Sequence, residues 1–154
     1  MNLKKEKMAN SRFVFHQFKD DLNFWQAVLG KIDNFIKDHT QFERANPYVY
    51  IYFLPENIFW IGREVIGVLP FIGDEDPRIL DFKGGEIYSF SLEFDLNFKL
   101  NDLLNLKNKI CQENVLEIDV SLPWRLRIDL EKEDKIPLEM EFFTANYPFP
   151  KLTN

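Results

Sequence analysis

Residues 57–70 read NIFWIGREVIGVLP, and the rest of the chain is interpreted around this stretch. It is apolar at nearly every position, as expected for a buried strand, but it carries one carboxylate, Glu64, in its middle. Strand alternation places on one face Ile58, Trp60, Glu64, Ile66 and Val68. Gly62 leaves a gap on that face. A carboxylate with such neighbours is either paired with another group or part of a binding site.

A second strand precedes this one at residues 48–54, where Tyr48, Tyr50 and Tyr52 share one face. The turn residues Pro-Glu-Asn join the two runs, which predicts an antiparallel hairpin. Upstream, RFVFHQF at 12–18 reads as a strand, and the apolar spacing over 22–36 predicts an amphipathic helix. The first half of the chain therefore has the order β-α-β-β.

The second half repeats this order. Residues 86–96 alternate as a half-buried strand, and residues 103–114 predict a second helix. Two further strands are predicted at 124–130 and 136–145, separated by a charged turn.

The spacing of equivalent positions agrees between the halves. Phe13 and Pro47 are 34 residues apart and Ile87 and Pro123 are 36 apart, while Glu64 and Glu141 follow those prolines by 17 and 18 residues. We therefore predict an α+β fold of tandem duplicated βαββ units, with one antiparallel sheet, two helices packed on one side and a central cleft.

The predicted boundaries follow from this duplication. The two repeats cover 12–72 and 85–148 of a single domain at 12–150, and the linker at 73–84 is rich in glycine and acidic residues. Residues 1–11 are polar and are expected to be disordered.

The composition excludes several classes of protein. A net charge of −6 without a basic cluster argues against a nucleic-acid partner. The single cysteine, Cys111, excludes an internal disulfide, and no apolar run is long enough to span a membrane. With no secretory signal at the N-terminus, we expect a soluble, cytoplasmic protein. The 16 Phe, 5 Tyr and 3 Trp indicate either an aromatic-rich core or an apolar cavity.

No motif for nucleophilic or metal catalysis is present. His16 and His39 are the only histidines, and neither has a serine or cysteine placed for activation or a third residue placed for metal binding. The sequence therefore predicts no catalytic residues, no metal and no cofactor, and it leans away from an enzyme.

Two segments carry a resemblance to a known family. GGEIYSFSLEFDLNFKLNDLLNLKNKI, from residue 84, and WRLRIDLEKEDKIPLEMEFF, from residue 124, resemble the strand, long helix and closing hairpin of the GyrI-like small-molecule-binding family. That family also provides effector-binding domains behind AraC-type and MerR-type DNA-binding modules. The likeness covers about residues 12–150. Two departures stand out: Phe94-Asp95-Leu96-Asn97 replaces a Gly-Pro-Tyr-like turn, and the proline ending is displaced to Tyr147-Pro148.

The resemblance implies a cleft between the halves that binds ligands, often cationic and aromatic, beside a buried glutamate on the last strand. Glu141 matches that glutamate best, with Glu139 as the alternative and Glu64 as the counterpart in the first half. Carboxylates and aromatic faces both favour a desolvated cation. The predicted ligand-binding residues are therefore Glu141, Glu64, Trp124, Trp60, Tyr50, Tyr48, Tyr52, Phe143 and Glu139.

The leading hypothesis is a stand-alone domain that captures an apolar or cationic aromatic ligand, as a monomer or a homodimer, with a buried glutamate as counter-charge. One alternative is an acidic module that binds or inhibits a basic protein partner. A second is a small hydrolase of reactive small molecules, because some relatives in the family use pocket carboxylates and tyrosines in this way.

Overall fold

The computed structural model describes residues 3–67, 77–94, 99–131 and 136–152. Two α-helices lie in these ranges, α1 (Trp25–Asp38) and α2 (Leu100–Glu113), with short 3-10 turns at Leu22–Phe24 and Pro55–Asn57. The strands are β1 (Lys4–Met8), β2 (Ser11–Lys19), β3 (Glu43–Arg44), β4 (Tyr48–Leu54), β5 (Ile58–Ile66), β6 (Arg78–Phe82), β7 (Gly85–Phe94), β8 (Trp124–Asp129) and β9 (Ile136–Phe143).

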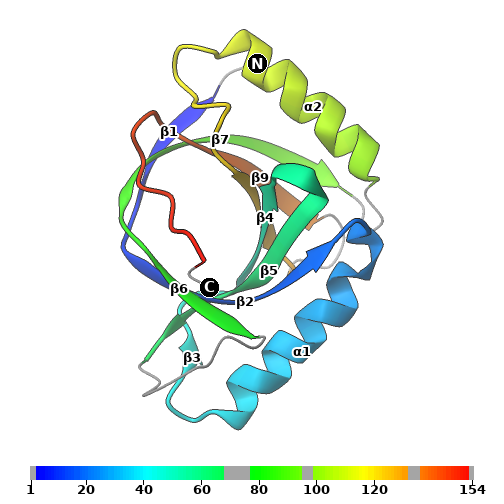
Figure 1. Ribbon diagram of the computed structural model, residues 1–154, viewed down its shortest axis with the longest axis vertical. Coiled ribbons are helices and arrows are strands. Elements are labelled where there is room, and N and C mark those ends of the chain that lie inside the picture. Colours follow the sequence, from blue (N-terminus) through cyan, green and yellow to red (C-terminus); the bar gives the residue numbers. More distant parts are fainter. Residues whose placement is uncertain (1–2, 68–76, 95–98, 132–135, 153–154) are drawn as a thin grey trace.

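All strand pairs are antiparallel and belong to one sheet, in the order β1-β7-β9-β8-β4-β5-β2-β6, with β3 added beside β5. The sheet is strongly curled, and both helices lie on its outer, convex side (Figure 1). The α+β class, the antiparallel sheet and the placement of two helices on one face are thus as predicted.

The curl brings the two ends of the sheet order back together. Pairing of β1 with β7 runs to Met8 opposite Gly85, and pairing of β2 with β6 continues the same register from Ser11 opposite Phe82. The two pairs are therefore parts of one long ladder between residues 4–15 and 78–89. At its bend, a Cβ on Gly84 would lie 2.7 Å from the carbonyl oxygen of Met8, so the close approach requires glycine.

The two halves of the chain share the predicted element order. The first half contains β2-α1-β4-β5 and the second contains β7-α2-β8-β9. In the sheet they meet where β4 pairs with β8, and each half places its last strand between the other two. A tandem duplication of the sequence stays a prediction.

Strand alternation divides the side chains between two cores. Apolar residues on the convex face, such as Ile51, Ile61 and Leu126, pack under Trp25 of α1 and Leu103 of α2. The opposite, concave face carries the aromatic and charged residues of the same strands.

Three sequence interpretations differ from the structure. Residues 1–11 were expected to be disordered, but Lys4–Met8 forms β1, because the edge of β7 offers its backbone groups for pairing. Part of the expected linker, Arg78–Phe82, is a strand for the same reason along β2, while 73–76 lie outside the described residues. Finally, Gly62 leaves no gap, because a Cβ there would lie 1.9 Å from the carbonyl oxygen of Val14 on the neighbouring strand.

Candidate functional site

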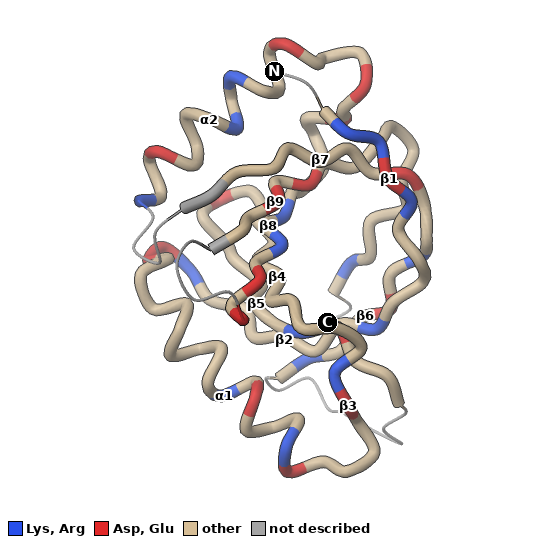
Figure 2. Tube along the Cα trace, turned by 180° about the vertical axis from the view of Figure 1, so that it is seen from behind, with Lys and Arg blue, Asp and Glu red and all other residues tan. Residues whose placement is uncertain are grey.

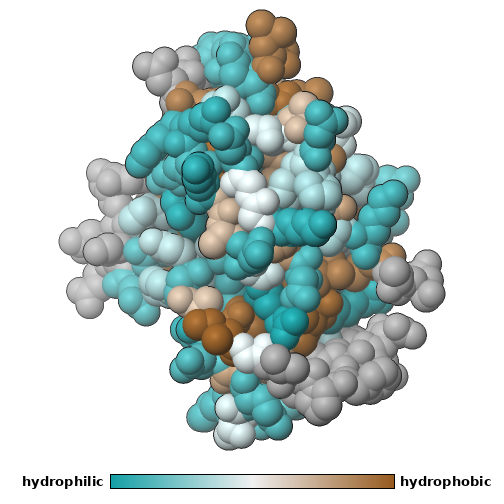
Figure 3. All heavy atoms as spheres, turned by 90° about the vertical axis from the view of Figure 1, so that its left-hand side faces the viewer, coloured by the Kyte–Doolittle hydropathy of each residue, from teal (hydrophilic) through white to brown (hydrophobic). Residues whose placement is uncertain are grey.

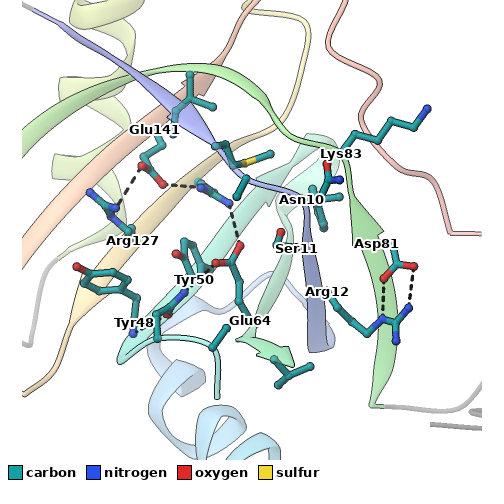
Figure 4. A pocket seen from close by; sticks show the side chains of 18 of the residues that line it. Asn10, Ser11, Arg12, Tyr48, Tyr50, Glu64, Asp81, Lys83, Arg127 and Glu141 are labelled. Atoms are coloured by element: carbon teal, nitrogen blue, oxygen red, sulfur yellow. Dashed lines mark hydrogen bonds and ion pairs between the residues drawn. The ribbon is translucent and has the colours of Figure 1, made fainter. Parts of the chain in front are cut away.

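A pocket of about 720 Å³ lies on the concave side of the sheet. Its walls come from both halves of the chain and include Tyr48, Tyr50, Glu64, Arg125, Arg127 and Glu141. In Figure 4 the side chains of Glu64, Arg127 and Glu141 point into the same space from β5, β8 and β9. The volume falls in the range typical of pockets for small organic ligands.

A buried ion cluster forms the inner wall of this pocket. Arg125 is only 2% exposed, and its Nε donates to Oε1 of Glu141 at 2.7 Å. Its Nη1 donates to the Tyr52 hydroxyl at 2.7 Å and lies 3.9 Å from Oε2 of Glu64. Figure 2 shows the basic positions of β8 beside the acidic positions of the adjacent strand β9. One buried guanidinium therefore faces two buried carboxylates.

The protonation of this cluster follows from its contacts. Burial alone lowers the pKa of Arg125, but Tyr52, Glu141, Tyr50 and Glu64 raise it, and the net pKa lies above the usual value. Burial raises the pKa of the Tyr50 hydroxyl, and the negative charge of Glu64 raises it further. Burial also raises the pKa of Tyr52, against the opposing effect of Arg125. The guanidinium thus stays charged and both phenols stay neutral.

Glu64 and Glu141 differ in how they are engaged. Glu141 is fully buried and pairs closely with Arg125. The side chain of Glu64 is 11% exposed, and its Oε1 accepts from Nδ2 of Asn46 at 2.9 Å. Because Arg125 is bound closely by Glu141, Glu64 is the carboxylate whose charge is less fully neutralised.

Arg127 extends the charged region toward solvent. Its guanidinium lies 3.8 Å from Glu141, 3.9 Å from Glu6, and 4.9 Å from the ring centroid of Tyr48. Arg125 stacks similarly over Tyr50, at 4.5 Å. One face of the Tyr48 ring and one face of the Tyr50 ring are thus each in contact with an arginine of the chain itself.

Several buried polar atoms on this face of the sheet, some in the pocket wall and some beside it, have no hydrogen-bond partner among the described residues. They are Nε of Arg127, Oε2 of Glu141, Oε2 of Glu139 and Oγ of Ser89. The strand register places them together, since Ser89 is opposite Glu141 and Arg127 is opposite Glu139. Unpaired buried donors and acceptors are costly, so this wall is suited to hydrogen bonding with a polar group.

The rim of the pocket carries an exposed ion pair. Arg12 donates from Nε and Nη2 to the two carboxylate oxygens of Asp81, at 2.7 and 3.1 Å. The hydrogen bond from Arg12 holds the pKa of Asp81 below its usual range. The face of the molecule drawn in Figure 3 is mostly hydrophilic in its upper part and exposes hydrophobic residues in its lower part.

The other end of the concave interior is aromatic. After β9, residues 147–152 run back into the curl of the sheet, as the C-terminal trace in Figure 1 shows. The Phe149 ring lies among four rings, with centroid distances of 5.9 Å to Tyr52, 5.9 Å to Trp60, 5.6 Å to Phe82 and 5.5 Å to Phe143. A mainly apolar pocket of about 610 Å³ adjoins this segment.

The structure brings most of the predicted site residues to one face and separates one from it. Trp60, the three tyrosines, Phe143 and the glutamates lie on the concave face. Of these, Tyr48, Tyr50, Glu64 and Glu141 line the 720 Å³ pocket, and Trp60 lines the apolar one. Trp124 was grouped with Glu141 but pairs with Phe142 and packs on the convex face, since neighbouring residues of a strand point to opposite sides.

Three functional residues were missed by the sequence analysis: Arg125, Arg127 and Phe149. The alternation in WRLRID was the available signal for the arginines, because it places both on the face opposite Trp124, Leu126 and Ile128. No comparable signal identifies Phe149, which belongs to no helix or strand.

The histidines take no part in the pocket. Neither lines it; the His39 ring bonds through Nδ1 with the carbonyl oxygen of Phe35 at 2.8 Å, and His16 lies on β2. Among the residues that the structure describes, no group of three or more His, Cys, Asp or Glu is arranged to hold a metal ion. None of the helices in the described ranges is long and apolar enough to cross a membrane.

The sequence matches no protein-family model and no curated protein. The fold is similar to that of SAV2435 in a structure bound to tetraphenylphosphonium, with a TM-score of 0.58, 9% identity, and coverage of 93% of this chain and 94% of that one. It is also similar to a Staphylococcus aureus MU50 protein provisionally assigned to bacterial transcription regulation, with a TM-score of 0.54, 8% identity, and coverage of 92% and 98%. At these identities the likeness is one of fold.

Proposed function

We propose that this chain is a GyrI-like small-molecule-binding domain, and that the 720 Å³ pocket takes an organic cation with aromatic groups, with Glu64 as its counter-charge. The observation that carries the proposal is the imbalance of the buried cluster. Arg125 pairs closely with Glu141 and lies 3.9 Å from Glu64. The second arginine of the wall, Arg127, lies near Glu141 and Glu6, and among the described residues no ion pair joins it to Glu64. A buried carboxylate without full compensation favours a cation beside it.

The surroundings of Glu64 fit this role. Asn46 donates a hydrogen bond to its Oε1, which holds the carboxylate at the pocket wall. Tyr48 and Tyr50 add aromatic surface to the same pocket. Carboxylates and aromatic rings together are a common recognition surface for desolvated organic cations. The similar fold of SAV2435, with tetraphenylphosphonium bound, supports the choice of ligand class.

The proposal is tested by calorimetric titration with tetraphenylphosphonium. We expect binding to the wild type and an affinity at least about tenfold lower for Glu64→Gln, which keeps the shape and the acceptor oxygen but removes the charge. The matched control is Glu139→Gln, a substitution of the same kind on the same face, outside the residues that line the pocket. It should bind as the wild type does.

An uncharged ligand of similar size distinguishes the contribution of the ligand's charge from that of its aromatic rings. Triphenylphosphine oxide presents similar rings without a cationic centre, so it should bind the wild type more weakly than tetraphenylphosphonium and should not distinguish Glu64→Gln from the wild type. Equal affinity of tetraphenylphosphonium for Glu64→Gln and the wild type would show that Glu64 is not the counter-charge.

A further inference from the structure

We propose that the four rings around Phe149 form a second binding site, for an uncharged aromatic molecule, which residues 147–152 of the chain occupy in this structure. The rings come from four different strands, with Tyr52 on β4, Trp60 on β5, Phe82 on β6 and Phe143 on β9. We call these four residues the aromatic cage.

The geometry of the cage is that of a site for a flat ring. Phe149 stacks on Trp60 at an interplanar angle of 29° and meets Phe82 and Phe143 edge-on, at 87° and 79°. Offset stacking and edge-to-face contact are the favoured arrangements of aromatic pairs. A ligand ring in the place of Phe149 would make the same contacts.

The walls of the cage suit an uncharged ligand. The Arg125 guanidinium lies 5.6 Å from the ring centroid of Tyr52 and 5.9 Å from that of Phe143, but its charge is already paired with Glu141. No carboxylate is among the described residues that line the adjoining 610 Å³ pocket, so a cationic ring would lose its hydration there without gaining a counter-charge. The adjoining 610 Å³ pocket has Leu54, Leu122 and Pro123 among its walls, which suits an apolar extension of the ligand.

The occupying segment is held by few polar contacts. The hydrogen bond that joins this segment to the rest of the molecule is donated by the Tyr147 hydroxyl to the carbonyl oxygen of Lys83, at 2.7 Å. The Phe149 amide donates only to Tyr147 within the segment, and Pro148 and Pro150 have no amide to donate. In the described part of the chain, no hydrogen bond or ion pair joins residues 150–152 to the sheet. Release of Phe149 therefore requires the loss of one tertiary hydrogen bond and of the ring contacts.

Displacement can be followed at Phe149 itself. We would place 4-fluorophenylalanine at position 149, record its fluorine resonance, and add indole as an uncharged aromatic probe. We expect the resonance to move toward that of the same label at position 24, since Phe24 is 63% exposed and reports a solvated ring. Binding of indole, measured by calorimetry, with no movement of the resonance at 149 would overturn the proposal.

Two variants test the competition. Tyr147→Phe removes only the hydroxyl that holds the segment, so indole should bind about fivefold more tightly, the factor typical of one lost hydrogen bond. Phe149→Ala removes the competing ring and should raise the affinity further. The control Phe24→Ala makes the same substitution at an exposed position and should leave the affinity unchanged.

Two results would reject this second site. One is equal affinity of the wild type, Tyr147→Phe and Phe149→Ala for indole, and the other is a lack of binding to all three. Neither result affects the proposal for the charged pocket, because that proposal is judged by tetraphenylphosphonium and Glu64 alone.

Discussion

The concave interior has two ends that differ in how the chain fills them. At the charged end, glutamates and arginines leave a pocket of about 720 Å³ open. At the aromatic end, the rings of four strands close around Phe149 of the same chain. Both ends are built from the same face of the same sheet, so strand alternation alone does not separate them.

The boundary between the two ends is Arg125. It binds Glu141 and faces Glu64 on one side, and it bonds Tyr52 and stands behind Phe143 on the other. A single buried cation thus lies between the carboxylates of one end and the rings of the other. The comparison shows that one face of a sheet can hold a charged end and an aromatic end side by side.

Removing Arg125 should have the largest effect, because it breaks both ends at once. Arg125→Met leaves Glu141 and Glu64 buried without a counter-charge, and we expect a loss of about 3–5 kcal/mol in the free energy of unfolding. Urea denaturation at pH 7 measures it. The control Arg127→Met removes a guanidinium that is 24% exposed and should cost about 1 kcal/mol or less. Similar losses in both variants would contradict the central role of Arg125.

At the aromatic end, we compare the stability effect of truncating a residue of the cage with that of truncating Phe149, which occupies it. Phe82 is 2% exposed, so Phe82→Ala should lower the free energy of unfolding by about 3–5 kcal/mol. Phe149 is only partly buried and belongs to no strand, so Phe149→Ala should cost about 1 kcal/mol. Thermal and urea denaturation check both values. If Phe149→Ala is as destabilising as Phe82→Ala, the segment is part of the core and not a replaceable occupant.

The two buried carboxylates should respond differently to loss of charge. Glu141→Gln weakens a charged hydrogen bond to Arg125 and should cost about 1.5–3 kcal/mol. Glu64→Gln removes the less compensated charge and should change the free energy of unfolding by about 1 kcal/mol or less. Parallel urea titrations of the two variants measure these losses. A larger loss for Glu64→Gln than for Glu141→Gln would indicate that Glu141, and not Glu64, is the counter-charge for the ligand.

Alkaline pH should destabilise the interior through its tyrosines. Folding raises the pKa of Tyr50, Tyr52 and Tyr147 above 10.0, that of Tyr147 to about 12, chiefly by burial. The proton is therefore held more tightly in the folded state, and the stability from this source is complete below pH 10 and is lost as the pH rises above it. Each such tyrosine adds about 1.4 kcal/mol per pH unit to the slope at which the free energy of unfolding falls. Unfolding midpoints between pH 8 and 11 measure the slope, which should be shallower for Tyr52→Phe than for the wild type.

The smallest effect is expected at the rim of the charged end. The side chain of Asp81 is 65% exposed, so Asp81→Asn should cost about 1 kcal/mol or less. Because Arg12 lowers the pKa of Asp81, its contribution is present above the ordinary carboxyl pKa and is lost as the pH falls through the lowered value. Urea midpoints at pH 7 and pH 3 should converge for the variant and the wild type at the lower pH. A loss at pH 7 as large as that of Arg125→Met would contradict this ranking.

Periodicity predicted the parts of the fold that local pattern controls. The helix over 22–36 and the paired strands around Pro55–Asn57 follow from apolar spacing and turn residues, and both are present. β1 and β6 were missed because neither has a strong pattern of its own; each is stabilised by an edge that forms only in the complete sheet.

The site could be predicted from the sequence only where the alternation of side chains along a strand determines which face a residue lies on. Tyr50, Glu64 and Glu141 were predicted as ligand-binding residues, and in the structure all three line the charged pocket. The pairing of Glu141 with Arg125 depends on the register between β8 and β9, and the distance from Glu64 to Arg125 depends on the curl of the sheet. Neither the register between two strands nor the curvature of the sheet can be predicted from the sequence of one strand.

The continuous ladder between residues 4–15 and 78–89 also bears on the kinetics of folding. Its partners are more than 60 residues apart in the chain, whereas the hairpins β4–β5 and β8–β9 join near neighbours. Closing long loops is entropically costly, so contacts of this kind tend to form late. In pulsed hydrogen exchange during refolding, the amides of β1 and β6 should gain protection after those of β4 and β5. The interior would then be assembled as an open sheet and enclosed in the final step.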